Sequence, residues 1–164
     1  MIIMCMGGIM KYKVLIVVLI LILLIIGIKV FLNSRKEIVV SNINHLSFFY
    51  TRGYAMNADI RYEMDCNDGM CVVTYKPYGV EKAKKKNIDN KTMKKIEDIL
   101  NKYEVGKWDG FNKNDKNVLD GDSFSMYINM IDGTSISASG YMKWPTNYRD
   151  VRDELDSLFE EIFK

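Results

Sequence analysis

The stretch of the chain richest in groups that could bind or react is KWDGFNKNDKNVLDGDSF, residues 107–124. It combines one tryptophan and two phenylalanines with two Asp-Gly pairs and several further carboxylates and amides. Oxygen-bearing side chains at this density are typical of a calcium loop, and neighbouring aromatic rings are typical of a groove for sugars or peptides. A connector between a helix and a hairpin has a similar composition, because its turns need glycine and its rings close the edge of the core.

The calcium interpretation fails on the spacing of the ligands. An EF-hand loop requires oxygen ligands at its first, third and fifth positions. A loop beginning at Asn112 places Lys116 at the fifth position, and a loop beginning at Asp120 places Phe124 there. We therefore predict no metal site and no cofactor. Two interpretations of the stretch remain, a scaffold, which we favour, and a ligand groove. The aromatic residues that would line such a groove are Trp108, Phe111 and Trp144.

Candidates for catalysis are few. The only histidine, His45, and the thiol of Cys66 are a conceivable base and nucleophile for a hydrolase or thiol enzyme. Cys66 and Cys71 also flank a predicted hairpin, across which a disulfide is within reach, and their spacing is not that of a usual zinc site. We predict no catalytic residue and take Cys66 and Cys71 as a candidate disulfide.

Residues 14–32, VLIVVLILILLIIGIKVFL, form an apolar run with Lys29 as its only charge. As a helix it would be about 28 Å long at about 1.5 Å per residue, close to the hydrocarbon thickness of a bilayer. A cleaved signal peptide has a shorter apolar region followed by small residues, which this run lacks. We predict an uncleaved, single-pass signal-anchor in the cytoplasmic membrane, with residues 1–13 as a cytoplasmic tail. The flanking charges do not choose an orientation, and we expect the polar domain to be outside.

The charge of the remaining chain is balanced. Of the 23 Lys and Arg residues, three precede residue 33, which leaves 20 basic residues against all 21 acidic ones in residues 33–164. A nearly neutral domain has no broad field for nucleic acid, so we predict no nucleic-acid partner. Residues 81–95 carry seven lysines against Glu81 and Asp89. Such a run is typical of a solvated loop and helix start, although it could also contact an anionic surface.

We predict that residues 33–43 are a tether and residues 44–164 a single domain. Residues 46–77 favour two or three antiparallel strands, the last two joined in a hairpin around Asn-Asp-Gly. Helices are predicted over residues 86–106 and 145–164 from apolar residues at spacings of three and four. Possible N-caps are Asn90 or Thr92 for the first helix and Thr146 or Asn147 for the second.

The register of a hairpin over residues 124–141 follows from its pattern. With the three-residue loop Ile131–Gly133, the apolar face of the first strand lies opposite Thr134, Ile136, Ala138 and Gly140. A two-residue loop would instead place the intervening serines opposite that apolar face, so the pattern selects the longer loop with Gly133 in a left-handed conformation. Together these elements predict an α+β fold: a two-layer domain with an antiparallel sheet of about five strands, two helices on one face, and the transmembrane helix before it.

Three segments, KWDGF, VLDGDSFSMYINMIDG and GYMKWPTNY, followed by a terminal amphipathic helix, resemble a pattern in small lipoproteins and membrane-anchored extracytoplasmic domains of bacteria. The resemblance covers residues 107–164. It implies an extracytoplasmic, tethered domain and supplies no activity and no catalytic residues. The chain departs from the lipoproteins because no cysteine that could be lipidated follows the apolar run.

We therefore predict a membrane-anchored binding or interaction module of the cell envelope, such as an immunity-like protein or an accessory subunit with an envelope protein partner. One alternative is an envelope hydrolase or thiol enzyme that uses Cys66 and His45. A second alternative is an anchored ligand sensor with an aromatic groove near Trp108 and Trp144. The sequence does not indicate the oligomeric state.

Overall fold

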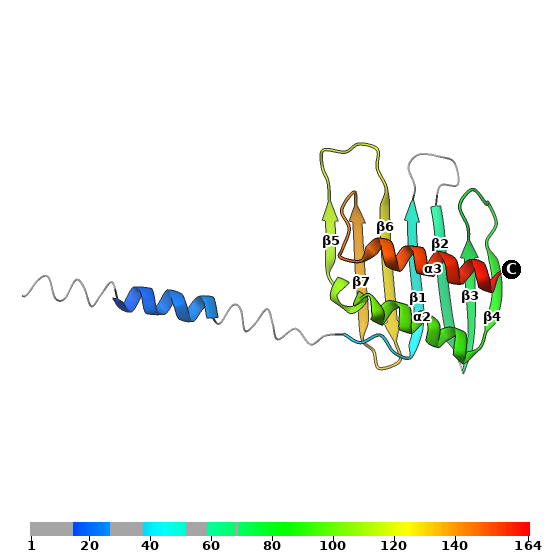
Figure 1. Cartoon of the computed structure of the whole chain (residues 1–164), viewed down its shortest axis with the longest axis horizontal. Helices are drawn as coiled ribbons and strands as arrows, with labels where there is room; N and C mark the ends of the chain where they lie inside the picture. The colour runs from blue at the N-terminus through cyan, green and yellow to red at the C-terminus, as the bar shows by residue number, and fades with distance from the viewer. Residues whose placement is uncertain (1–14, 27–37, 52–58, 68) are drawn as a thin grey trace, which may run out of the picture. The chain divides into compact units, whose positions relative to one another are not determined.

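The computed structural model describes residues 15–26, 38–51, 59–67 and 69–164. The chain divides into two compact units, Met1–Glu37 and Ile38–Lys164. In the first unit the described residues form a helix over residues 15–26, and its large apolar side chains are all exposed. The second unit contains a sheet and the remaining helices (Figure 1).

The predicted transmembrane helix over residues 14–32 is wrong for the part of the chain that is described. None of the described helices is long and apolar enough to cross a membrane. The described helical residues, 15–26, span about 18 Å at about 1.5 Å per residue, less than a hydrocarbon core of about 30 Å. The other residues of the predicted span, and the tail over residues 1–13, lie outside the described residues.

The second unit is built on one seven-stranded sheet with the order β4-β3-β2-β1-β6-β7-β5. Neighbouring strands are antiparallel except β5 and β7, which are parallel. The strands are β1 (Ile43–Thr51), β2 (Asp59–Asn67), β3 (Met70–Lys76), β4 (Lys84–Ile88), β5 (Phe111–Asn114), β6 (Ser123–Met130) and β7 (Ser135–Tyr141).

The prediction of a five-stranded antiparallel sheet is therefore corrected to a seven-stranded mixed sheet. The two strands that the sequence pattern misses, β4 and β5, are the two edges of the sheet. An edge strand pairs on one side only, and β4 and β5 show no alternating burial, so they lack the period-two apolar pattern of a half-buried strand. The strand β4 also carries lysines, and lysine side chains on an edge strand hinder its pairing with strands of other chains.

The described residues of the unit also form two α-helices and one short 3-10 helix: α2 (Asn90–Lys102), η1 (Val105–Trp108) and α3 (Tyr148–Ile162). Asp89 caps α2, because its side chain accepts a hydrogen bond of 2.8 Å from the Thr92 backbone N–H. The predicted caps Asn90 and Thr92 both lie within this helix. At the start of α3, Asn147 occupies the N-cap position in a left-handed conformation without a side-chain cap.

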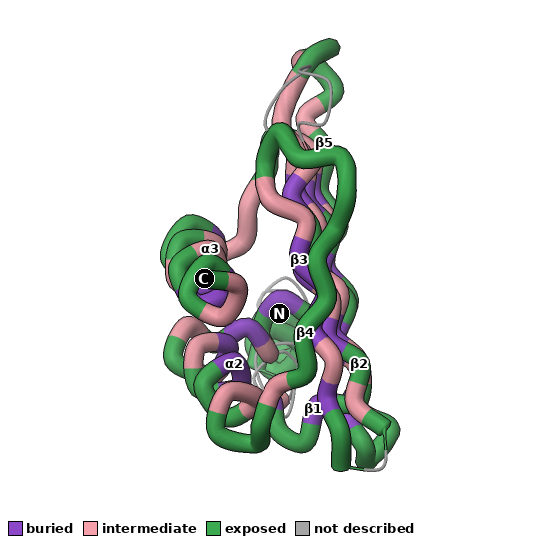
Figure 2. Tube along the Cα trace, turned by 90° about the vertical axis from the view of Figure 1, so that its right-hand side faces the viewer, coloured by how far each residue is buried: buried purple, intermediate pink, exposed green. Residues whose placement is uncertain are grey.

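Helices α2 and α3 cover one face of the sheet, as Figure 2 shows, and the core lies between them and the strands. Alternate residues of β1 point into this core, among them the fully buried Leu46 and Phe48. From the helices, Ile96 and Leu100 of α2 and Phe159 of α3 complete it. The opposite face of the sheet carries mostly polar side chains.

The predicted register of the β6–β7 hairpin is confirmed. Met126 lies opposite Ala138, and Ile128 lies opposite Ile136. Gly133 has a φ of 84°, in the left-handed region that glycine enters without strain.

The second unit begins at Ile38, and its first residues are tied to α2 by specific contacts. The side chain of Asn101 accepts a hydrogen bond from the Val40 N–H at 2.8 Å and donates one to the Val40 carbonyl at 2.7 Å. A Cβ on Gly106 would lie 1.8 Å from the Ile38 carbonyl oxygen, so only glycine permits this approach. Residues 38–43 therefore pack as part of the domain, with Val40 and Ile43 in its core.

Candidate functional site

The three aromatic residues that the sequence suggests for a ligand groove line one cavity, with a volume of about 360 Å³. We call this cavity the aromatic groove. Trp108 comes from η1, Phe111 from β5, and Trp144 from the connector between β7 and α3. The other lining residues are Tyr103, Glu104, Lys107, Lys113, Pro145, Thr146 and Asn147.

Trp108 is mainly a structural residue of this groove. It is 2% exposed, and its indole N–H donates a hydrogen bond of 3.0 Å to the Thr146 carbonyl. Its ring meets Phe124 edge-on, at 6.2 Å between the ring centroids. Trp108 therefore joins η1 to the connector that carries Trp144, which is the scaffold role favoured from the sequence.

Trp144 and Phe111 are partly exposed and form the accessible part of the groove. The indole of Trp144 stacks on Tyr148, with centroids 4.6 Å apart and ring planes inclined by 20°. The ammonium group of Lys113 lies 5.3 Å from the centroid of the Phe111 ring. On the rim, Lys107 forms an ion pair with Glu104. The groove thus offers aromatic faces beside cationic side chains.

The connector with Trp144 is held in place by a close packing contact. A Cβ on Gly140 would lie 2.1 Å from the Lys143 carbonyl oxygen and 2.6 Å from Cε1 of Phe124. The absence of a side chain at Gly140 therefore lets the connector fold back over the end of β7. The small residue at this position accommodates the backbone of the connector and the Phe124 ring.

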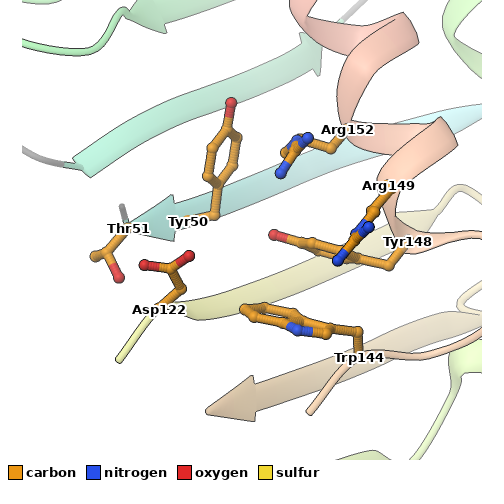
Figure 3. Close-up of a pocket in the computed structure, with 7 residues that line it drawn as sticks. All are labelled: Tyr50, Thr51, Asp122, Trp144, Tyr148, Arg149 and Arg152. Carbon is orange, nitrogen blue, oxygen red and sulfur yellow. The ribbon is translucent and has the colours of Figure 1, made fainter. Parts of the chain in front are cut away.

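A second cavity, of about 80 Å³, lies beside the groove and also contacts Trp144 (Figure 3). We call it the arginine pocket. Its lining residues are Tyr50, Thr51, Asp122, Trp144, Tyr148, Arg149 and Arg152. In Figure 3 the carboxylate of Asp122 lies across the pocket from the guanidinium of Arg149, with the Tyr148 ring between them and Trp144 beneath.

The two arginines of the pocket differ in their contacts. Arg152 donates hydrogen bonds of 2.9 and 2.7 Å to Oδ1 of Asp153, and its guanidinium lies 5.9 Å from the centroid of the Tyr50 ring. Burial lowers the pKa of Arg152, but the hydrogen bond and attraction to Asp153 outweigh it and leave that pKa raised. Arg149 is exposed and forms no ion pair with any residue of the described part of the chain.

The sequence gives only one signal for the arginine pocket. Arg149 and Arg152 are three residues apart at the start of a predicted helix, so they share one face of it. Tyr50 and Asp122 come from β1 and from the residues before β6, and only the pairing of these strands brings them together. No local pattern connects them with the arginines.

The residues of the enzyme alternative do not form a common site. Cys66 and Cys71 are directly opposite each other on β2 and β3 and are joined in a disulfide. Their sulfur atoms lie 4.0 and 3.6 Å from the sulfur of Met93 in α2, so they are on the helix-covered face. His45 pairs with Asp65 at 2.6 Å, and because successive residues alternate, this pair is on the opposite face.

Within the described residues, no three His, Cys, Asp or Glu side chains are grouped closely enough to hold a metal ion. No protein-family model and no curated protein matches the chain. A functional assignment therefore depends on the chemistry of the aromatic groove and the arginine pocket.

Proposed function

We propose that residues 38–164 form a binding module that holds its ligand against Trp144 in the aromatic groove. The observation that carries this proposal is the convergence of Trp108, Phe111 and Trp144 on one cavity of about 360 Å³. This volume is in the usual range for small-molecule sites, which are lined by aromatic side chains with a few polar groups at the rim. The groove is also suitable for one or two residues of a peptide.

The three rings differ in burial, and this difference supports a binding role for the groove over a purely structural one. Trp108 is buried and fixed by its hydrogen bond to Thr146, which leaves its ring little room to adapt. Trp144 and Phe111 keep part of their surfaces exposed beside Lys107 and Lys113. Aromatic rings held in this way provide contact area at small entropic cost when a ligand binds.

The disulfide supports an extracytoplasmic location for this module. Disulfides persist in oxidising compartments and are rare in the cytosol, where thiols are kept reduced. Cys66 and Cys71 are opposite each other in a regular hairpin, so the bond forms without disturbing the strand pairing. A role outside the cytoplasm agrees with the location that the sequence resemblance implies.

The arrangement of His45 and Cys66 favours binding over the hydrolase or thiol-enzyme alternative. The sulfur of Cys66 is in the disulfide, and His45 is on the other face of the sheet beside Asp65. A nucleophile and its base must be within hydrogen-bond distance of each other, which these positions do not allow.

Tryptophan fluorescence of the full-length protein tests the proposal, with a panel of glycans and peptides as probes. We expect at least one probe to shift or quench the emission in a saturable manner. The Trp144→Phe variant should lose most of this response, because Trp108 is buried. A saturable response that persists unchanged in Trp144→Phe, or none across the panel, would contradict the proposal.

A further inference from the structure

Among the described residues, Trp144 alone lines both the aromatic groove and the arginine pocket. A ligand whose body lies in the groove and whose end enters the pocket would therefore contact the same indole twice. The two cavities differ in size, at about 360 and 80 Å³, and in chemistry. This difference suggests one ligand with a larger apolar body and a small charged end.

Arg149 is the group of the pocket best suited to bind a charged end. Arg152 already donates to Asp153, whereas Arg149 has no ion-pair partner in the described part of the chain. Arg149 lines the pocket together with Tyr148 and the shared ring of Trp144, as Figure 3 shows. A guanidinium presents a planar fork of N–H donors that matches the two oxygens of a carboxylate.

The pocket is small, with a volume of about 80 Å³ compared with about 360 Å³ for the groove, so it suits the end of a ligand better than its body. A carboxylate is a small anion whose two oxygens lie in one plane and match the planar N–H fork of Arg149. We therefore take a carboxylate as the end group, and phenyl phosphate tests the alternative anion.

We propose that the ligand is a carboxylic acid with an apolar or aromatic body, bound with its carboxylate on Arg149 and its body against Trp144 and Phe111. This inference rests on the proposed function and names the class of its ligand. A free acid and the C-terminal residue of a peptide present the same chemistry. Lys113 at the groove adds positive charge that favours the same class of ligand, whereas the charge of Lys107 is paired with Glu104.

Matched acids and amides test this assignment on the full-length, disulfide-bonded protein. The probes are N-acetylphenylalanine and its amide, acetyl-Ala-Ala-Ala-Phe as acid and amide, and phenyl phosphate. Affinity is measured from the indole N–H signal of Trp144 in NMR titrations, which the two tryptophans of the chain make simple to assign. We expect one of the acids to bind at least about tenfold more tightly than its amide, the effect of one charge-assisted hydrogen-bond pair.

The variant Arg149→Gln should abolish the preference for the acid, so that acid and amide bind with equal affinity. The control Arg61→Gln, an exposed arginine of β2 on the other face of the sheet, should keep the preference. Binding of the peptide acid alone would identify a peptide C-terminus as the source of the carboxylate. Binding of the free acid alone would identify a small acid.

Equal affinity for acid and amide, or a preference that survives in Arg149→Gln, would overturn the inference. If Trp144→Ala then removed the binding of both, measured by isothermal titration calorimetry because this variant lacks the indole signal, the proposed function would stand without the carboxylate. Tighter binding of phenyl phosphate than of the acids would also overturn it. So would the absence of any shift at Trp144 with all five probes, in which case the broader fluorescence panel decides the proposed function separately.

Discussion

Two aromatic clusters pack under α3, and they differ in how completely they are closed. The closed cluster consists of Phe48, Tyr50, Tyr62, Tyr75 and Phe159, each no more than 7% exposed. The open cluster consists of Trp108, Phe111, Phe124, Trp144 and Tyr148, of which Phe111 and Trp144 are partly exposed. Contact between Phe48 and Tyr148, with centroids 6.2 Å apart, joins the two clusters.

The clusters also differ in whether their polar groups have partners within the fold. In the closed cluster the hydroxyls of Tyr50 and Tyr62 both donate to the carboxylate of Asp156 on α3, so these groups are satisfied within the fold. Beside the open cluster, the Arg149 guanidinium has no described ion-pair partner. The comparison teaches that aromatic content alone does not distinguish the two clusters. The open cluster differs by its partly exposed rings and by the neighbouring Arg149, and the proposed site is based on these features.

Replacement of one large ring in each cluster should separate stability from binding. Phe159→Ala removes a fully buried ring whose centroid is 4.6 Å from that of Tyr62, and should lower the free energy of unfolding by about 3–5 kcal/mol. Trp144→Ala should cost less stability, because its ring is partly exposed, and should abolish ligand binding. Urea unfolding measures the loss of stability, and isothermal titration calorimetry measures the loss of binding without depending on the tryptophan that is replaced. Equal losses of stability would mean that both clusters are only core.

Asp156→Ala should destabilise the closed cluster without affecting the groove. The substitution leaves the hydroxyls of Tyr50 and Tyr62 without their charged acceptor, and we expect a loss of about 2–3 kcal/mol in the free energy of unfolding. Asp150→Asn, an exposed carboxylate in the first turn of the same helix, is the control and should change stability by less than about 0.5 kcal/mol. A loss of similar size in both variants would count against the role of the tyrosine hydroxyls.

Gly140→Ala should affect both stability and binding, because the added methyl group displaces the connector that carries Trp144. The new Cβ would lie 2.1 Å from the Lys143 carbonyl oxygen, and overpacking of this kind costs about 1–3 kcal/mol. Ser139→Ala, on the neighbouring residue and the other face of β7, is the matched control. Unchanged ligand affinity in Gly140→Ala would show that the position of the connector does not matter for binding.

The smallest effect is expected at Glu154, which joins α3 to α2 beside the groove. Hydrogen bonds from Lys102 and Tyr103 hold the pKa of Glu154 below its usual value. A depressed carboxyl pKa stabilises the fold fully above the ordinary glutamate pKa, and this contribution is lost as the pH falls through the lower, folded-state pKa. Wild type should therefore lose slightly more stability on acidification than Glu154→Gln. The difference is small because the Lys102–Glu154 pair is largely exposed to solvent. Identical dependence of stability on pH in the two proteins would show that this pair contributes nothing to stability.

The sequence predicts elements well where one face is buried. The β6–β7 register follows from Met126, Ile128 and their small or apolar partners, because a slip by one residue would expose the whole apolar set. The sequence does not predict the edge strands β4 and β5, because they pair on one side only and their side chains do not alternate between buried and exposed. The apolar run over residues 14–32 predicts a transmembrane helix, whereas the described helix covers only residues 15–26 and is not long enough to cross a membrane.

The sequence predicts the aromatic residues of the candidate site but not its arginine. Trp108, Phe111 and Trp144 are recognisable by residue type, and the fold brings them to one groove. Arg149 is not recognisable in this way, because an exposed arginine on an amphipathic helix usually faces water. Its significance depends on Asp122 and Tyr50, which strand pairing places nearby and which no sequence spacing connects with it.

Chemical-shift mapping of the full-length protein tests the central claim, that the open cluster binds a ligand and the closed cluster is scaffold. The measurement is a ¹H–¹⁵N spectrum recorded while acetyl-Ala-Ala-Ala-Phe and, in a separate titration, N-acetylphenylalanine are added. The account predicts that at least one of them causes saturable shifts at Trp144, Phe111, Tyr148 and Arg149, with Tyr62 and Phe159 unchanged. Shifts centred on the polar face of the sheet, around Tyr127 and Ser137, would contradict it.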